Sequence, residues 1–246
     1  MDNLTYEKKI LIRSEQVDMT RKLRISELFR LMEEASIAHT EQLGCTRAFT
    51  LDRGLLWIIT RQQAEIRELP AYDEEIVVRS WQGDMMHVFF PRFYEICRGD
   101  EVLVRGQALW MLIDEKTRDM IMPEEYGIEI PGRPGSDDMM IPAVTIPASA
   151  GEPFAREELV TRFSQVDING HMNNTRYFDI IDDALRADAA KAAPPAPRKI
   201  LANYLSELRL GDRFTLSGYR QTGQNGETLY FEGMGDKPMF RIRLDY

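Results

Sequence analysis

The sequence predicts an α+β protein built from two tandem repeats, each with one long helix followed by a meander of long strands in an antiparallel β-sheet. Two observations lead to this class. A helical pattern followed by a run of long strand patterns occurs twice, which is the order of an α+β meander and not of a βαβ unit. Between the two copies lies a stretch crowded with proline and glycine, residues 131–153, which predicts a linker.

The N-terminal copy is expected over residues 1–130. Alternation from Tyr6 to Asp18 predicts a strand, and apolar residues at helical spacing predict a helix from Ser26, as its cap, to Leu43, with Gly44 as its stop. Four long strands rich in Ile, Val, Phe and Trp should follow, over Leu55–Arg67, Glu75–Gln82, Met86–Cys97 and Val102–Asp114.

The C-terminal copy is expected over residues 154–246 and repeats this order. Glu158 to Val166 predicts a strand, and Thr175 to Ala193 predicts an amphipathic helix that ends before a run of prolines. Four more strands are expected, over Ile200–Arg209, Arg213–Gln221, Glu227–Gly233 and Met239–Leu244.

The two copies also share sequence. With Gln16 aligned to Gln165, the strings QVDMTRKLRISELFRLMEEAS and QVDINGHMNNTRYFDIIDDAL have Gln, Val, Asp, Phe and Ala in common, which indicates an internal duplication. Only the aspartate of the second copy's polar loop is kept, as Asp18 and Asp167. The positions that differ are Asn169, Gly170, His171, Asn173 and Asn174, aligned with Thr20, Arg21, Lys22, Arg24 and Ile25. A single site in the second copy is therefore expected.

Composition narrows the class of function. A formal net charge of −9 argues against nucleic-acid binding by the whole surface. The two cysteines are far apart, and no histidine stands at zinc-ligand spacing, which argues against a disulfide scaffold or a metal site. No apolar run is long enough to span a bilayer, and the first residues lack a signal-peptide pattern. A cytoplasmic protein with no metal, membrane span or nucleic-acid partner is expected.

Asp167, Asn169 and His171 stand at alternate positions just before the second predicted helix. If the backbone is extended there, their side chains leave on one side. Histidine can move a proton near neutral pH, aspartate can orient the imidazole, and the asparagine amide can donate to an oxygen or hold the water. A helix start adds N–H donors and partial positive charge. Such a set is sufficient for attack of water on a thioester, although the same residue types are also common in loops and caps.

The string VDINGHMNNTRYFDIIDDAL resembles the D-x-N-x-H-x-N-N signature of the acyl-acyl carrier protein thioesterases of plants and bacteria. LLWIITRQQAEI, GQALWMLID and TRDMIMPEEY are similar to that family's N-terminal half, in the same order, so the resemblance runs from about Tyr6 to Leu216. It implies two hot-dog folds in tandem, the first non-catalytic and supplying much of the acyl pocket. It also implies hydrolysis of fatty acyl-acyl carrier protein to free fatty acid, without a cofactor.

The family's second motif, Y-x-x-E-C, matches the chain from Tyr204 to Glu207 and then departs, because Leu208 stands at the cysteine position. The resemblance therefore adds Glu207 to the catalytic set, as a base or a group that orients water. It does not supply a cysteine nucleophile, so direct attack by water is expected. From the residues alone, Glu207 on the strand Ile200–Arg209 could equally form an ordinary ion pair with Arg209.

Other candidate residues concern substrate and partner. The family pattern suggests Met32 and Trp57 for the acyl pocket, where core packing is the alternative, and Asn173 and Asn174 for substrate binding. The densest basic group of the chain is hypothesised to bind the acidic carrier protein or the phosphate of its 4'-phosphopantetheine, with simple solvent exposure as the alternative. The group centres on Arg21, Lys22 and Arg24, with Lys8, Lys9 and Arg13.

Two other functions are compatible with parts of this pattern. A hot-dog acyl-CoA thioesterase would share a D-x-x-x-H-x-N-N loop, but the tandem organisation and Glu207 favour the carrier-protein substrate. A non-catalytic acyl-binding module is disfavoured by the intact polar loop. Acyl chain length and saturation depend on pocket shape and are not predicted. A homodimer is compatible with this organisation.

Overall fold

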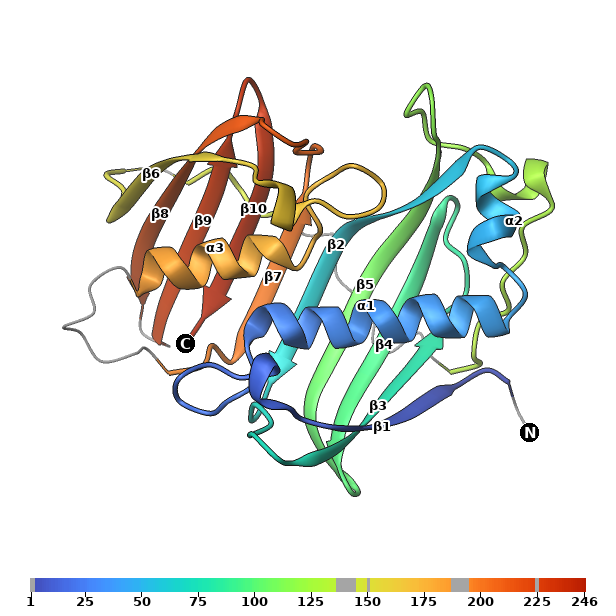
Figure 1. Cartoon of the computed structure of the whole chain (residues 1–246), viewed down its shortest axis with the longest axis horizontal. Helices are drawn as coiled ribbons and strands as arrows, with labels where there is room; N and C mark the ends of the chain where they lie inside the picture. The colour runs from blue at the N-terminus through green and yellow to red at the C-terminus, as the bar shows by residue number, and fades with distance from the viewer. Residues whose placement is uncertain (1–2, 136–144, 150, 187–194, 224–225) are drawn as a thin grey trace. The chain divides into compact units, whose positions relative to one another are not determined.

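The computed structural model describes residues 3–135, 145–149, 151–186, 195–223 and 226–246 (Figure 1). The chain forms two compact units, one of residues 1–24 and 28–143 and the other of residues 25–27 and 144–246. This division falls inside the predicted linker, of which residues 136–144 and 150 lie outside the described residues. Among the described residues, no helix is long and apolar enough to cross a membrane.

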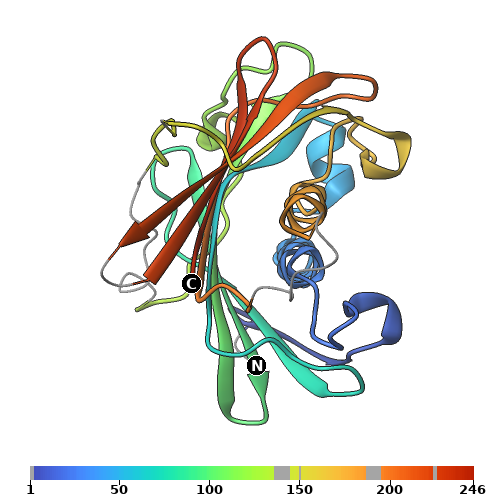
Figure 2. The same ribbon diagram turned by 90° about the vertical axis from the view of Figure 1, so that its left-hand side faces the viewer.

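The first unit contains a five-stranded antiparallel sheet in the order β1-β3-β4-β5-β2. Helix α1 runs along one face of this sheet (Figures 1 and 2) and buries Leu28, Phe29, Met32 and Ala35, which follow helical spacing. The strands are β1 (Tyr6–Leu11), β2 (Leu55–Ile66), β3 (Glu75–Gln82), β4 (Phe89–Arg98) and β5 (Glu101–Asp114). The helices are α1 (Ile25–Gln42) and α2 (Arg47–Leu51), with 3-10 turns η1 (Ser14–Gln16) and η2 (Pro123–Tyr126).

Most predicted elements of this unit are present, with changes at their ends. The first strand stops at Leu11 and gives way to η1, so its predicted extension to Asp18 is wrong. Ser26 is buried inside α1 and does not cap it, because the N-cap position is Arg24. Gly44 does follow the helix, at a φ of 91° that favours glycine. Helix α2 has no counterpart among the predicted elements.

The second unit contains another five-stranded antiparallel sheet, in the order β7-β10-β9-β8-β6. Helix α3 (Arg176–Leu185) crosses one face of it and buries Tyr177, Phe178, Ile180 and Ile181 (Figures 1 and 2). The other elements are β6 (Ala155–Val160), η4 (Phe163–Gln165), β7 (Lys199–Tyr204), β8 (Arg213–Gly223), β9 (Gly226–Met234) and β10 (Pro238–Asp245). Residues 187–193 of the predicted helix lie outside the described residues.

Two predicted strands of this unit are too long. The strand expected to continue to Val166 ends at Val160 and is followed by η4. The strand expected to continue to Arg209 ends at Tyr204, where the N–H groups of Leu205 and Ser206 both donate to the Met239 carbonyl (2.8 and 3.0 Å). That shared acceptor lies at an irregularity of β10, and the regular ladder stops there.

A buried arginine joins α1 to the sheet of the first unit. The guanidinium of Arg92 lies 2.7 Å from Nδ1 of His39 and 2.6 Å from the hydroxyl of Thr40, and His39 Nε2 lies 3.0 Å from the Asn3 carbonyl. Because a guanidinium only donates, Nδ1 accepts, and the neutral ring donates its Nε2–H to Asn3. Burial lowers the pKa of His39, and the charge of Arg92 lowers it further. Burial also lowers the pKa of Arg92 to about 10.

This contact predicts a pH-dependent stability. Because the pKa of His39 is lower in the folded chain than its ordinary value of 6.5, stability is fully present above that value and falls as pH drops toward the folded pKa. His39→Gln should lower the free energy of unfolding by about 1–3 kcal/mol at pH 7.5, because buried donors are left unpaired. Between pH 7.5 and 5.5, this free energy should fall less in the variant than in the natural chain. Urea denaturation at both pH values measures this. The exposed His87, as His87→Gln, is the matched control, and equal pH slopes for His39→Gln and the natural chain would contradict the assignment.

Candidate active site

The loop between η4 and α3 closes on itself through backbone hydrogen bonds. The N–H of Asp167 donates to the His171 carbonyl (2.9 Å), and the N–H of Gly170 donates to the Asp167 carbonyl (3.1 Å). The carboxylate of Asp167 accepts the N–H of Asn169 at 2.7 Å, and Gly170 has a φ of 80°. The backbone is therefore not extended here, because an Asx-type turn separates Asp167 from His171. The turn still keeps the three predicted residues in one short loop.

A second segment lies beside this loop. The N–H of Met172 donates to the Leu208 carbonyl at 2.7 Å, and His171 forms a backbone bridge with Arg209. These contacts place Nε2 of His171 3.0 Å from the carboxylate of Glu207. Glu207 was predicted to lie on the strand, but it lies beyond the end of β7. Its side chain there contacts the imidazole of His171.

Glu207 also contacts Arg209, forming the ion pair that was the alternative to a catalytic role. Its Oε2 lies 3.6 Å from Nη2 of Arg209, a longer contact than the 3.0 Å to His171. The Arg209 side chain is 59% exposed, whereas that of His171 is only 13% exposed. An exposed pair at this distance contributes little to stability, so the contact with His171 is the one that fixes the geometry of Glu207.

The start of α3 uses the two asparagines that follow His171. The side-chain oxygen of Asn173 accepts the N–H (2.9 Å) and the hydroxyl (2.6 Å) of Thr175, and so orders the first turn. The carbonyl of Asn174 accepts the hydroxyl of Tyr204 at 3.1 Å. Both residues, predicted to bind substrate, thus connect the loop to the helix and to the end of β7.

The two residues predicted for the acyl pocket lie in the first unit. Met32 is fully buried on α1, with its sulfur against Gly106 of β5, where a side chain would collide with it. Trp57 on β2 is half-buried and packs edge-on against Phe90, with ring centroids 4.9 Å apart. Core packing accounts for both positions.

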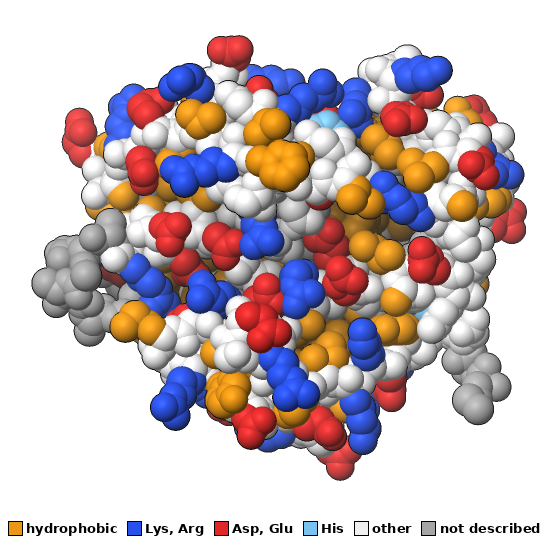
Figure 3. Space-filling model, in the orientation of Figure 1, with side chains coloured by type: hydrophobic (Ala, Val, Ile, Leu, Met, Phe, Trp, Pro, Cys, Tyr) orange, Lys and Arg blue, Asp and Glu red, His pale blue; other side chains and the backbone are white. Residues whose placement is uncertain are grey.

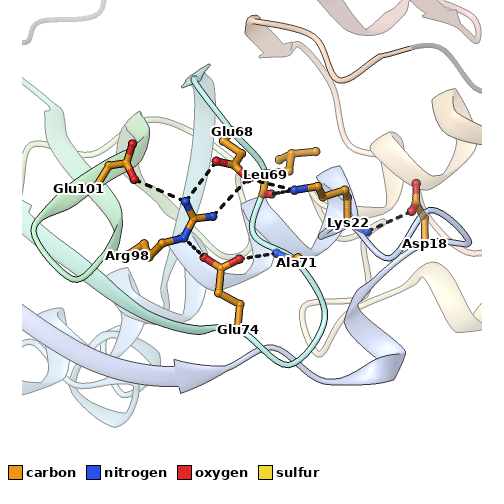
Figure 4. A network of polar contacts seen from close by, with 8 residues as sticks. All are labelled: Asp18, Lys22, Glu68, Leu69, Ala71, Glu74, Arg98 and Glu101. Atoms are coloured by element: carbon orange, nitrogen blue, oxygen red, sulfur yellow. Dashed lines mark hydrogen bonds and ion pairs between the residues drawn. The ribbon is translucent and has the colours of Figure 1, made fainter.

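Two members of the basic group of the first unit, Lys22 and Arg24, form hydrogen bonds within that unit, and Figure 4 shows those of Lys22. The ammonium of Lys22 lies 3.1 Å from the Glu68 carboxylate and 3.2 Å from the Leu69 carbonyl, and Glu68 also pairs with Arg98. Hydrogen bonds from Arg98 and from Lys22 lower the pKa of Glu68 to about 2. Arg24 donates to the Val17 carbonyl at 3.0 Å. Of the three predicted docking residues, Arg21 and Arg24 are exposed, and Arg21 has a φ of 62°.

The loop of the first unit has the same pattern of hydrogen bonds as the loop of the candidate site, and this shared pattern is called the frame below. Asp18 accepts from the N–H of Thr20, and its own N–H donates to the Lys22 carbonyl, as Asp167 does with Asn169 and His171. The Leu23 N–H donates to the Pro70 carbonyl, as Met172 does to Leu208. The side chains that pair across the two segments differ between the units: Lys22 pairs with Glu68 in the first unit, and His171 pairs with Glu207 in the second. Glu68 was not predicted, although a Glu-Leu pair follows the first sheet strand after the helix in both copies.

Two solved structures share this fold over the whole chain. The 12:0-ACP thioesterase from Umbellularia californica has a TM-score of 0.80 at 19% identity, covering 98% of this chain and 93% of its own. An acyl-ACP thioesterase from Bacteroides thetaiotaomicron has a TM-score of 0.78 at 20% identity, covering 99% and 98%. Their fold and the two units described above define a double hot-dog protein, which confirms the predicted fold class.

The chain belongs to the acyl-ACP thioesterase family. The family's N-terminal domain model matches residues 3–129, and its C-terminal domain model matches residues 149–234, which confirms the predicted resemblance. A chloroplastic dodecanoyl-acyl carrier protein hydrolase of Cinnamomum camphora is 27% identical over 195 residues, 72% of this chain and 50% of its own length. A chloroplastic acyl-acyl carrier protein hydrolase of Cuphea viscosissima is 26% identical over 191 residues, covering 72% and 46%. The chain thus spans about half the length of these curated relatives.

The contacts of Lys22 predict that replacing Lys22 lowers the thermal stability of the chain more than replacing its neighbour Arg21 does. Lys22→Met should lower the thermal midpoint, because Glu68 loses one of its two cationic partners and the Leu69 carbonyl loses a donor. Arg21→Met is the matched control and should leave the midpoint almost unchanged, since Arg21 is exposed. Thermal denaturation at low salt measures both. Equal midpoints for the two variants would show that the network adds nothing to stability.

Proposed function

We propose that the chain hydrolyses the thioester of fatty acyl-acyl carrier protein to free fatty acid and carrier protein. The observation that carries the proposal is the 3.0 Å contact between His171 Nε2 and Glu207, at the start of α3, in a chain of this family. An imidazole paired with a carboxylate is an arrangement that can take up and return a proton near neutral pH. Names of the relatives support the substrate.

The proposed reaction begins with a water molecule whose proton passes to the pair of His171 and Glu207. The water oxygen bonds to the acyl carbon, the C–S bond breaks, and the proton is returned to the leaving thiolate of the carrier. Asn169, whose backbone is fixed by Asp167, is proposed as the donor to the carbonyl oxygen. The N-terminus of α3 favours the negative charge that develops on this oxygen.

Direct attack by water is favoured over a cysteinyl intermediate. Leu208 replaces the family's cysteine, is buried, and offers its backbone carbonyl to Met172. Cys45 and Cys97 are buried in the first unit, and burial raises the pKa of both thiols. A thiol with a raised pKa has little thiolate and is a poor nucleophile at neutral pH.

The experiment that tests the proposal compares acyl-acyl carrier protein with acyl-CoA of the same chain length. The natural chain should hydrolyse acyl-acyl carrier protein with a higher kcat/KM than acyl-CoA. His171→Ala and Glu207→Gln should each lower kcat by about 10²–10⁴-fold, the range of general acid–base catalysis. Arg209→Gln is the matched control, since it alters only the longer contact to Glu207. Unchanged turnover in His171→Ala would contradict the assignment of the catalytic site. A higher kcat/KM with acyl-CoA would show that acyl-CoA, and not the carrier protein, is the substrate.

Docking of the carrier protein is proposed at the basic group of the first unit, with Arg21 as the side chain that contacts the partner. On the face shown in Figure 3, acidic and basic side chains are interspersed, so the net charge of −9 leaves room for local basic contacts. Lys22 and Arg24 hold the loop that presents Arg21. An acidic carrier or its phosphopantetheine phosphate would pair with such a cation.

Charge reversal tests the docking proposal. Arg21→Glu should raise KM for acyl-acyl carrier protein by about threefold to tenfold at low salt, the effect expected for a charge at the edge of an interface, and should leave kcat unchanged. Steady-state kinetics with the carrier substrate measures this. Arg13→Glu, another exposed arginine of the same basic group, tests whether the effect is confined to Arg21. An unaltered KM in Arg21→Glu would exclude docking there.

A further inference from the structure

A side-chain hydrogen bond of the second unit has no role in the mechanism above. The hydroxyl of Tyr204, the last residue of β7, donates to the carbonyl of Asn174 at 3.1 Å. Asn174 stands one residue before the N-cap of α3, and a carbonyl at that position is not used by the hydrogen bonds of the helix itself. The contact therefore joins the strand that leads to Glu207 with the loop that contains His171.

The two segments are joined at a second point as well. His171 and Arg209 form a backbone bridge, and next to it the Met172 N–H donates to the Leu208 carbonyl at 2.7 Å. This bridge follows Glu207 in the sequence, whereas the tyrosine contact precedes it. A segment held at one point can pivot about that point. Because this segment is held on both sides of Glu207, its path between the two points is fixed.

In the first unit, the residue that corresponds to Tyr204 cannot make this contact. The Leu23 N–H donates to the Pro70 carbonyl there, as the frame requires. Ile66, the last residue of β2, stands as many positions before Pro70 as Tyr204 stands before Leu208. Ile66 is buried, and its side chain has no polar group. The unit whose frame lacks an imidazole thus has an aliphatic residue where the candidate site has a hydroxyl.

The ring of Tyr204 is held by packing and not by its hydroxyl. Its centroid lies 5.4 Å from that of Tyr177 on α3, with the ring planes tilted by 56°. A phenylalanine would keep this contact. Tyr204 and Asn174 are both partly exposed, so water can replace the hydroxyl on the carbonyl. Tyr204→Phe therefore removes the connection between the segments and keeps the packing around it.

We propose that Tyr204 is a positioning residue for the pair of His171 and Glu207. This inference rests on the proposed function. The hydroxyl acts through the backbone of the loop and transfers no proton. By holding the loop against the end of β7, it keeps Nε2 of His171 and the Glu207 carboxylate at the 3.0 Å separation seen in the structure. Proton transfer requires groups within hydrogen-bond reach, so a looser pair reacts more slowly with substrate that is bound equally well.

The test is Tyr204→Phe with acyl-acyl carrier protein as substrate. We expect kcat to fall by about 5-fold to 30-fold, because a small misplacement of reacting groups slows the chemical step, and KM to stay within about twofold of the natural value. Tyr94→Phe is the matched control, since the fully buried hydroxyl of Tyr94 in the first unit pairs with Ser36 at 2.5 Å. Its urea midpoint should fall at least as far as that of Tyr204→Phe, with an unchanged kcat.

A double-mutant cycle tests whether the hydroxyl acts through the pair. Glu207→Gln removes the carboxylate whose position the hydroxyl is proposed to fix. In that background, Tyr204→Phe should change kcat by less than about twofold, because the effects of residues that act as a unit are not additive. A hydroxyl that only stabilised the fold would lower kcat by the same factor in both backgrounds.

The outcomes separate this inference from the proposed function. Turnover by the natural chain with an unchanged kcat in Tyr204→Phe would overturn the role of the hydroxyl and leave the proposed function intact. The same would follow from equal factors in the two backgrounds, or from an equal fall of kcat in Tyr94→Phe. A folded natural chain that releases no fatty acid from acyl-acyl carrier protein would overturn both.

Discussion

The candidate site depends on one backbone hydrogen bond, from the N–H of Met172 to the carbonyl of Leu208. It joins the loop before α3 to the segment that follows β7, which are more than thirty residues apart in sequence. Because Glu207 immediately precedes Leu208 and His171 immediately precedes Met172, the bond brings their side chains together. The same bond, from Leu23 to Pro70, joins the corresponding segments of the first unit.

The same frame holds different chemistry in the two units. In the second unit, an imidazole is paired with a carboxylate, and histidine is the side chain type suited to moving a proton near neutral pH. In the first unit, Lys22 replaces the imidazole, and Arg98 adds a second cation on Glu68, whose pKa falls to about 2. A carboxylate held so strongly in its charged form is a poor base, and an ammonium is a poor partner for proton exchange at neutral pH. The electrostatics of the first unit therefore stabilise its loop and do not support catalysis.

Periodicity and turn residues predicted the two longer helices, α1 and α3, and most strands, because each of these has a local pattern of apolar side chains. Only the family motif added Glu207 to the catalytic set. Its contact with His171 was not predicted, since the strand was expected to continue through Glu207. The strand β7 ends where the Met239 carbonyl accepts the N–H groups of both Leu205 and Ser206. No pattern in the nearby sequence predicts this. The pairing of Lys22 with Glu68 was missed for the same reason: contacts between segments 46 residues apart depend on where each strand stops.

The residue at the tip of the loop shows how the shared frame was adapted in each unit. Arg21 and Gly170 occupy the same left-handed position, with φ of 62° and 80°. This conformation costs a residue with a side chain about 1–2 kcal/mol and glycine much less, so the first unit carries strain that the second avoids. A side chain at Gly170 would point into open space, so packing does not require glycine there. What glycine provides is a backbone without strain at the residue next to His171.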